Sequence, residues 1–459
     1  MVKKYTNVVT TSQIIAIVIC FALSSCRTYY DKTLTFNKKY EQGEYSEARD
    51  YLRSQKKLKK SNVKVLYDLN YAMSSFMMDS TAASIAHFDQ ADRYAEDFSK
   101  NYSYEALALI SNPMVRPYEV EYYERVMIHF FQALNYIKIG EEEDALVECR
   151  RMNLVLNQLS DAFKKHDGKR YSRDAFGHYM MAVLYEMAGD DNNAFIAYRN
   201  ALEIYEDDYA RLFGMSVPEV IKTGIIRTAY RTGFTTELLK YENKFRLKHK
   251  ESAKGKGRLV TFMLDGMSPV KTEVNVDFVK NQNGGVVNFS NGNTGLTIPI
   301  LWGDCTSSEK SSLKDVSYIR MAIPQYISRG SRCDGVLSIN GAAQRIDVVE
   351  DVDKVARQSL KDRLWRELGK SLLRTAAKEA IHQAAAKQNE YAGLLVNIMN
   401  AVTEKADTRS WMSLPSKIRV VDVELDAGTY NVDYSSCATN SATIDVSEGR
   451  TTFAVFRGF

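Results

Sequence analysis

The residue types that most often bind metals or act as nucleophiles are few in this chain of 459 residues, which has six histidines and six cysteines. The histidines stand alone, and none forms HExxH or another short zinc-ligand spacing. No GxSxG motif is present to expose a serine nucleophile. Cys149 has the neighbours of a helical repeat position rather than those of an activated thiol. We therefore predict no catalytic, cofactor-binding or metal-binding residues, and a protein that is not an enzyme.

Cys26 differs from the other cysteines because it directly follows a segment that resembles a secretory signal. Two lysines near the start are followed by polar residues and by an apolar stretch at 14–23, which is the plan of a secretory signal. That stretch is shorter than the roughly 20 residues needed to span a bilayer. The sequence LSSC at 23–26 resembles the bacterial lipobox, in which the thiol receives diacylglycerol. We predict that residues 1–25 are a lipoprotein signal peptide. We also predict that Cys26 carries lipid, with palmitate among its acyl chains, and serves as an N-terminal membrane anchor.

The residues after Cys26 bear on location. Arg27 rather than Asp follows the cysteine, and by resemblance to sorting rules in enteric bacteria this favours the outer membrane. Residues 27–31 contain a single acid, so the acidic cluster that sends some lipoproteins to the cell surface is missing. We expect the periplasmic face of the outer membrane. The alternative is a cysteine that merely ends a cleaved signal.

Charge argues against nucleic acid as a partner. Removal of the signal takes two lysines, so Lys and Arg fall from 61 to 59 against 57 acids, a net charge of +2. Nucleic-acid binding calls for a strongly basic face, which such a balance does not provide. The sequence identifies no small-molecule substrate either.

Four cysteines remain after Cys20 is removed and Cys26 is lipidated. An oxidising compartment permits disulfides, and of the three connectivities the sequence favours a Cys305–Cys333 pair within one domain. The alternative is that these cysteines are small buried residues with free thiols.

A repeat pattern organises the first half of the chain. Around Gly189, small and aromatic residues recur at the spacing of a tetratricopeptide repeat, namely Ala182, Tyr185, Ala194, Tyr198 and Ala201. The same register returns around Gly140 and Asp79, and more weakly around Gly43 and Gly233. We predict an α-solenoid of degenerate tetratricopeptide-like helix pairs over residues 26–250. Its concave surface is the usual site for a peptide or partner helix, the alternative being that the stack only supports the second half.

The second half has the period of two that is typical of half-buried strands. A basic segment at 246–258 separates the halves and predicts a solvated linker. We predict a β-rich, sandwich-like domain over 251–459, with a helical insertion at about 352–405 and a hairpin at Asn340-Gly341. The fold class is thus α+β. Strands are expected at 259–264, 273–278, 295–300, 316–323, 336–339 and 342–349, and a small antiparallel sheet at 418–425, 430–434, 442–446 and 452–456.

Several stretches resemble a family of uncharacterised bacterial envelope lipoproteins with tetratricopeptide-like repeats. They are DVDKVARQSLKDRLWRELGKSLLRTAAKEA from 351, LVTFMLDGMSPVKTEVNVDF from 259, and above all ADTRSW at 406–411. The resemblance implies location and architecture but no activity. In the last stretch we expect Asp407 and Arg409 to form an ion pair beside a packed Trp411 indole.

Three functions remain open. The first is a non-enzymatic outer-membrane lipoprotein that acts as a protein-binding scaffold or accessory factor in cell-envelope assembly. The second is a glycan- or peptidoglycan-binding module, and the third an unrecognised envelope hydrolase. Only Trp302, Trp365 and Trp411 are available to stack on a sugar, and that supply is poor.

Overall fold

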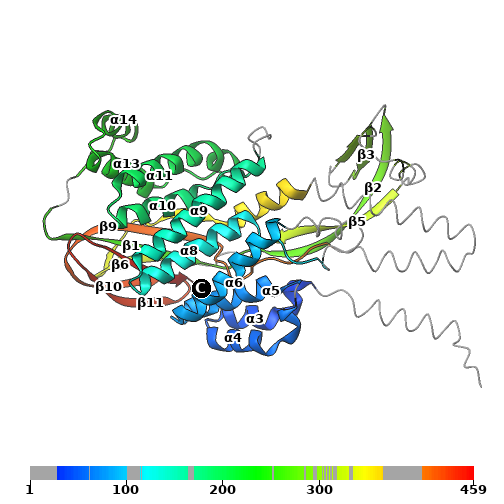
Figure 1. The fold of residues 1–459 in the computed structure, drawn as a ribbon, viewed down its shortest axis with the longest axis horizontal. Coiled ribbons are helices and arrows are strands. Elements are labelled where there is room, and N and C mark those ends of the chain that lie inside the picture. Colours follow the sequence, from blue (N-terminus) through cyan, green and yellow to red (C-terminus); the bar gives the residue numbers. More distant parts are fainter. Residues whose placement is uncertain are drawn as a thin grey trace, which may run out of the picture.

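The computed structural model is an α+β fold in which the helices precede most of the strands (Figure 1). The expected fold class is therefore confirmed at this level. The residues that the structure describes are 28–60, 62–100, 114, 116–163, 170–250, 253–283, 286–292, 297–301, 303, 307, 310, 313, 318–329, 334–364 and 406–458.

Helices fill the first half of the described chain, and successive long helices pack against each other as hairpins. The helices are α2 (Tyr29–Lys32), α3 (Leu34–Glu41), α4 (Tyr45–Ser54), η1 (Lys56–Lys59), α5 (Lys64–Met77), α6 (Thr81–Lys100), α8 (Tyr122–Lys138), α9 (Glu142–Phe163), α10 (Ala175–Met187), α11 (Asp191–Ile204), the π-helix η3 (Tyr205–Tyr209), α12 (Ala210–Phe213), α13 (Glu219–Arg231) and α14 (Thr235–Phe245).

The turns between paired helices share one backbone device. Gly140 and Gly189 have φ of 82° and 74°, in the left-handed region that glycine enters without steric cost. Asp79 occupies the same position between α5 and α6 with φ of 57°, where a Cβ is tolerated less well. Helix hairpins thus lie at the turns predicted from the sequence, including those at Gly43 and Gly233.

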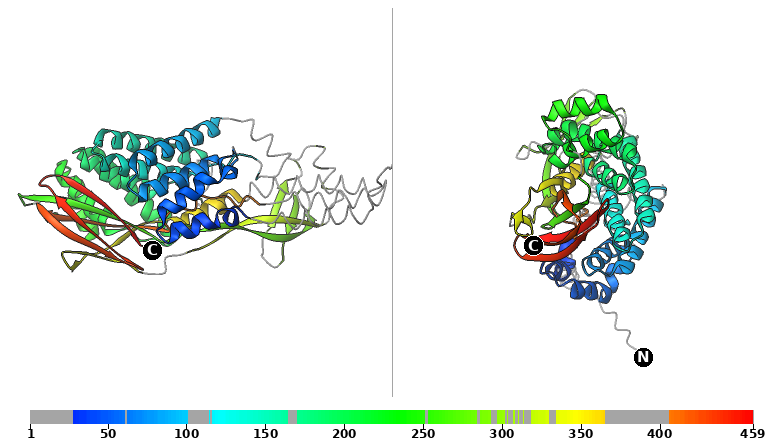
Figure 2. Two further views of the ribbon diagram at one scale, coloured as in Figure 1. Left: turned by 90° about the horizontal axis from the view of Figure 1, so that it is seen from below. Right: turned by 90° about the vertical axis from the view of Figure 1, so that its left-hand side faces the viewer.

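The helix hairpins curve around the sheets, as the right-hand view of Figure 2 shows. Helices α5 and α8 are buried along almost their whole length, because the outer helices cover one side and the strands the other. The prediction of an open concave surface for a partner is therefore wrong. The protein's own sheet occupies the inner face of the helical array, as the alternative of a supporting stack requires.

The described strands form three four-stranded sheets, ordered β12-β1-β9-β8, β11-β10-β6-β7 and β4-β3-β2-β5. Strand β12 pairs parallel with β1, and β9 pairs antiparallel with β1, so the expected antiparallel sheet of the last four strands is wrong. The strands are β1 (Lys256–Asp265), β2 (Val270–Asn283), β3 (Val286–Ser290), β4 (Thr297–Leu301), β5 (Tyr318–Ile327), β6 (Val336–Ile339), β7 (Ala342–Ala343), β8 (Asp347–Asp351), β9 (Lys417–Asp426), β10 (Gly428–Ser435), β11 (Thr439–Val446) and β12 (Thr451–Gly458).

Strand β1 lies at the centre of the molecule and is buried on both faces. Val260 and Phe262 point into the core shared with the helices, whereas Leu259 and Met263 point into the core shared with the sheet of β11, β10, β6 and β7. The expectation of a half-buried strand at 259–264 is therefore wrong. A strand between two layers needs apolar side chains on both faces, which explains its nearly unbroken apolar run.

The third sheet forms an arm beyond the helical body (Figure 1 and Figure 2, left). Its long strands β2 and β5 pair over ten residues, and β3 and β4 extend the sheet around a separate core that includes Phe278 and Phe289. The sequence prediction missed β3. It correctly predicted the hairpin at Asn340-Gly341, where both residues have positive φ.

The expected helical insertion is described only at its start, where residues 352–364 are helical. The rest of that prediction lies outside the described residues. Within the described part of the chain, no helix combines the length and apolar character needed to cross a bilayer.

Candidate functional site

The cysteines predicted to be modified lie outside the described residues. This applies to Cys26 and to both Cys305 and Cys333, so the lipidation and the Cys305–Cys333 pair stay predictions, although the disulfide at Cys437 allows only one of the two once Cys20 is removed with the signal. Cys437, in the turn between β10 and β11, is disulfide-bonded. Since Cys149 is free and every other cysteine lies outside the described residues, the partner of Cys437 is one of those.

Cys149 has the environment that the sequence predicted for it. It is fully buried on α9, and burial raises the pKa of its thiol to about 11. A thiol with so high a pKa supplies almost no thiolate near neutral pH and is a poor nucleophile. Across the described ranges, no group of three or more His, Cys, Asp or Glu side chains is placed to hold a metal ion.

A buried charge cluster joins the helices to the central sheet. Glu186 of α10 contacts Arg227 of α13 at 2.7 Å and Arg258 of β1 at 2.8 Å, and Arg258 contacts Asp422 of β9 at 2.6 Å. The Tyr198 hydroxyl donates to Glu186 at 2.7 Å. Burial by itself would raise the pKa of Glu186, but Arg227 and Arg258 outweigh it and lower that pKa. The segment predicted to be a solvated linker therefore ends in a buried structural residue, Arg258.

The predicted contact in ADTRSW is confirmed. Asp407 and Arg409 form an ion pair at 2.7 Å, and the Arg409 side chain is completely buried. The Trp411 indole packs edge to face against Phe88 of α6, with ring centroids 5.9 Å apart. Trp411 is thus unavailable as a sugar platform, and the other two tryptophans, Trp302 and Trp365, lie outside the described residues.

The same segment caps a buried carboxylate of α8. Glu124 accepts from the backbone N–H of Trp411 at 3.0 Å and from the Tyr118 hydroxyl at 2.9 Å. Burial, together with the neighbouring Glu121, raises the pKa of Glu124 to about 7. This group is closed off from solvent, so its shifted pKa has consequences for stability and not for catalysis.

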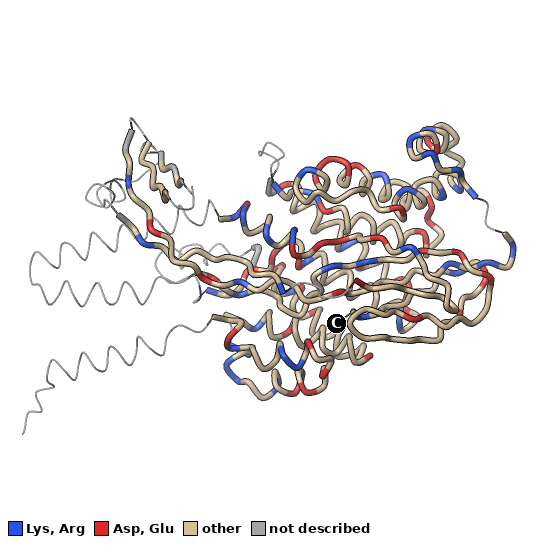
Figure 3. Tube along the Cα trace, turned by 180° about the vertical axis from the view of Figure 1, so that it is seen from behind, with Lys and Arg blue, Asp and Glu red and all other residues tan. Residues whose placement is uncertain are grey.

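Charge on the chain as a whole is mixed. Figure 3 shows Lys and Arg interspersed with Asp and Glu along both helices and strands. Along the described residues this distribution agrees with the near-neutral balance of the sequence.

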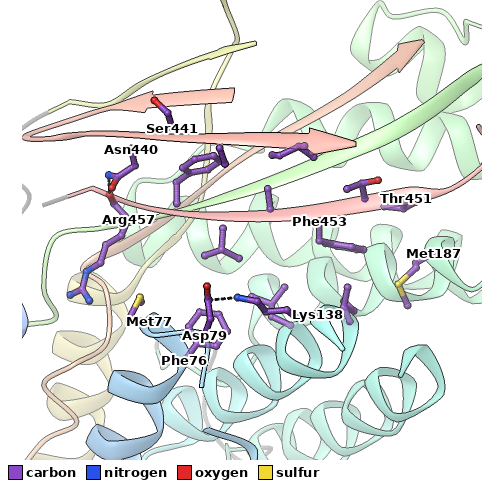
Figure 4. Close-up of a pocket in the computed structure, with 18 of the residues that line it drawn as sticks. Phe76, Met77, Asp79, Lys138, Met187, Asn440, Ser441, Thr451, Phe453 and Arg457 are labelled. Carbon is purple, nitrogen blue, oxygen red and sulfur yellow. Dashed lines mark hydrogen bonds and ion pairs between the residues drawn. The ribbon is translucent and has the colours of Figure 1, made fainter. Parts of the chain in front are cut away.

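One groove, with a volume of about 790 Å³, lies between the helical array and the C-terminal strands (Figure 4). One wall is made by the ends of α5 and α8, including Phe76 and Ile137, and by Met187 of α10. The opposite wall is β11, with Asn440 and Ser441 among its lining residues. Strand β12 runs along the groove between the two walls.

Polar and apolar side chains line the groove in similar measure. Asp79 and Lys138 form an ion pair at the helical side, and both side chains are largely exposed. Phe453 and Val455 of β12 project toward the helices and are only partly buried. The groove therefore offers apolar contacts beneath a charged edge, as small-molecule and peptide sites commonly do.

Strand β12 presents an open edge in this groove. In the order of its sheet, β12 is terminal, and among the described strands only β1 pairs with it. The N–H groups of Arg258 and Gly266 donate to the carbonyls of Arg450 and Gly458, so even-numbered residues of β12 direct their backbone groups toward β1. Odd-numbered residues face the groove, because backbone polar groups alternate between the two edges of a strand.

A side-chain contact agrees with this assignment. The Asn440 amide donates to the carbonyl of Arg457, at 2.7 Å, from the groove side. The backbone groups of Thr451, Phe453 and Val455 are then directed into the groove. The open edge could not be predicted from the sequence, because alternation identifies a strand but not its neighbours.

Comparison with known proteins identifies neither a family nor a function for this chain. No family model and no curated protein matches the chain. Among solved structures, MamA shares 16% identity over 48% of this chain and 92% of its own, with a TM-score of 0.28. BtubC (BKLC) from P. vanneervenii shares 13% identity over 53% of this chain and 85% of its own, also with a TM-score of 0.28. Likenesses this low define neither a family nor a function.

Proposed function

We propose that this protein is a non-enzymatic lipoprotein of the bacterial outer membrane, anchored at its periplasmic face by lipid on Cys26, that binds another protein of the envelope-assembly machinery. The helices in this proposal form a degenerate tetratricopeptide-like solenoid. In support, Ala182 and Ala194, the small residues of one repeat, are fully buried. Small residues there let the two helices of a hairpin approach closely.

The disulfide at Cys437 supports an exported protein. Disulfides persist in oxidising compartments such as the bacterial periplasm and are rare in the cytosol. Cys437 lies in a turn whose neighbouring residues are largely exposed, where a reducing compartment would keep a thiol reduced.

The start of the described chain fits a close attachment to a membrane. Tyr29 is buried, and its backbone N–H donates to the Thr408 hydroxyl at 3.2 Å. Only Arg27 lies between Cys26 and Thr28 in the sequence, and two steps along the chain span at most about 7 Å. A lipid on Cys26 would therefore hold the folded body directly at the bilayer surface rather than on a long tether.

The groove is the observation that carries the binding role. The inner face of the helical array is occupied by the sheet, so a partner cannot use the surface that solenoids commonly offer. The groove along β12 combines partly buried apolar side chains with a strand edge that no other described strand pairs with, and such a surface is stabilised by a protein partner.

Two measurements in intact cells test this proposal. A Cys26→Ser variant should accumulate with its signal uncleaved and without lipid, whereas the wild-type chain should be recovered processed in the outer-membrane fraction. A photocrosslinking residue at Met187, in the groove, should capture a specific envelope protein. As a control, the same crosslinking residue is placed at Leu154 on α9, which is 59% exposed and lies outside the groove.

The outcomes discriminate between the candidate roles. Full processing and lipid attachment of Cys26→Ser would refute the anchor. Equal capture from Met187 and Leu154, or recovery of wall fragments without protein, would refute the groove as a protein-binding site.

A further inference from the structure

We infer that the groove is the vacant position of a fifth strand in the central sheet, and that its occupant is an extended segment of a partner protein that pairs with the outer edge of β12. This inference deepens the proposed function and rests on it. It assigns both the binding mode and the chemistry of the segment that the groove accepts.

The two layers that cover the central sheet continue past its last strand. On one face, α5, α8 and α10 cover β1 and reach beyond β12 to contribute Phe76, Ile137 and Met187 to the groove. On the other face, β11 also reaches beyond β12 and contributes Ala442 and Ile444. The groove between the helices and β11 therefore continues the plane of the central sheet beyond β12.

The open backbone of β12 supplies the pairing. Thr451, Phe453 and Val455 direct N–H and C=O groups into the groove at intervals of about 6.7 Å, twice the rise per residue of a strand. An added strand would satisfy these groups in the same way that β1 satisfies those on the other edge. Main-chain hydrogen bonds of this kind supply the affinity in strand addition, and flanking pockets supply the specificity.

The two walls determine the sequence that fits. Side chains that point toward the helices would meet Phe76, Ile137 and Met187 and should be apolar. Side chains that point toward β11 would meet Asn440, Ala442 and the partly buried Ile444, because the even-numbered residues of β11 face the groove. The segment should therefore carry large apolar residues at every second position, facing the helices, and small or polar residues at the positions opposite Asn440 and Ala442.

A globular surface or a helix fits this groove less well. A helix has its backbone groups paired internally and would leave the edge of β12 unsatisfied. The Asp79–Lys138 ion pair stands at the rim, so the segment enters between a charged helical turn and the exposed strand β11.

The test uses peptides selected from a random twelve-residue library against the purified Cys26→Ser chain without residues 1–25. We expect the selected peptides to alternate apolar and small or polar residues. A bound peptide should slow amide hydrogen exchange at Phe453 and Val455 at least tenfold. Thr452 and Ala454, whose amides already face β1, should change little. Methylation of alternate peptide amides should weaken binding at least tenfold.

Matched variants locate the site. Ile137→Glu places a charge inside the groove, whereas Ile139→Glu makes the same change at a residue that is 51% exposed and outside it. Ala442→Trp fills the groove from β11, and Ala438→Trp adds the same bulk in the exposed turn nearby. Ile137→Glu and Ala442→Trp should each reduce peptide affinity at least tenfold, and the two controls should bind as the unmodified chain does.

Three results would overturn the inference. One is the absence of protection at Phe453 and Val455 with any selected peptide, and another is equal binding of the N-methylated peptides. The third is concentration-dependent self-association that Ala442→Trp abolishes, because the occupant would then be a second copy of the chain. If crosslinks from Met187 in cells persist while strand pairing fails, the proposed function survives and only the binding mode is wrong.

Discussion

Phe130 of α8 and Phe262 of β1 meet edge to face, with ring centroids 5.3 Å apart and ring planes inclined at 79°. Both rings are fully buried. Through this contact the helical array and the central sheet share one hydrophobic core. The two halves of the chain that differ in sequence period are thus joined by the same kind of packing that holds each half together.

Replacement of Phe262 tests the shared core. Phe262→Ala should lower the free energy of unfolding by about 3–5 kcal/mol, because a buried aromatic side chain is lost and a cavity remains. Denaturant unfolding followed by circular dichroism at helix and strand wavelengths should shift in parallel. Leu154→Ala on the exposed side of α9 should change little. Loss of strand signal at unchanged helix stability would contradict a common core.

Asp422 tests the buried charge cluster. Asp422→Ala leaves the buried guanidinium of Arg258 without its 2.6 Å partner and should cost about 3–5 kcal/mol of stability. Asp426→Ala, on the same strand but with a side chain 80% exposed, should cost less than about 0.5 kcal/mol. Similar stability losses in the two variants, measured by urea unfolding, would show that the cluster has no structural role.

Because of Glu124, the free energy of unfolding should decrease as the pH rises, which is the opposite of the usual effect of a carboxyl group. Its pKa is about 7 in the fold and 4.5 in the unfolded chain, so between these values the folded state binds the extra proton. Stability due to this group therefore falls as pH rises from 4.5 to 7, by about 3 kcal/mol at most. Glu124→Gln should remove this fall. Unfolding free energies of both chains at pH 5 and pH 8 check it, and a constant difference between them would contradict the shifted pKa.

Gly224 tests close packing between α13 and α11. A Cβ at this position would lie 2.4 Å from the Tyr198 ring, which is fully buried and hydrogen-bonded to Glu186. Gly224→Ala should therefore destabilise the protein by about 1–3 kcal/mol despite the better helix propensity of alanine. Thr223→Ala, at the exposed neighbouring position, is the control. Thermal unfolding that left Gly224→Ala as stable as the control would show that the Tyr198 ring can move aside.

Peptide mapping without reduction tests how the cysteines pair. If Cys20 is removed with the signal and Cys26 is lipidated, only Cys305 and Cys333 remain as partners for Cys437. We then expect a peptide that links Cys437 to one of these two. A Cys305–Cys333 peptide would instead leave Cys437 to bond Cys20 or Cys26, which is incompatible with lipidation.

Local patterns predicted most elements of the fold and one of its contacts. The left-handed turns at Gly140 and Gly189, the hairpin at Asn340-Gly341 and most strands follow from residue types within a few positions. The Asp407–Arg409 ion pair was predictable for the same reason, since its partners are two residues apart. Strand β3 was missed because it is short and its glycine-rich neighbourhood interrupts the alternation.

The sequence by itself determined which segments are helical or extended, and which face of each is apolar, because backbone propensity and side-chain period are local. It also supplied the prediction of lipid on Cys26. Only the tertiary structure decided what covers each apolar face. It paired β12 with β1 across almost 200 residues, buried Arg258 and filled the inner side of the helices with the sheet. The open edge of β12 belongs to this second group, since an edge exists only once all other strands have taken their neighbours.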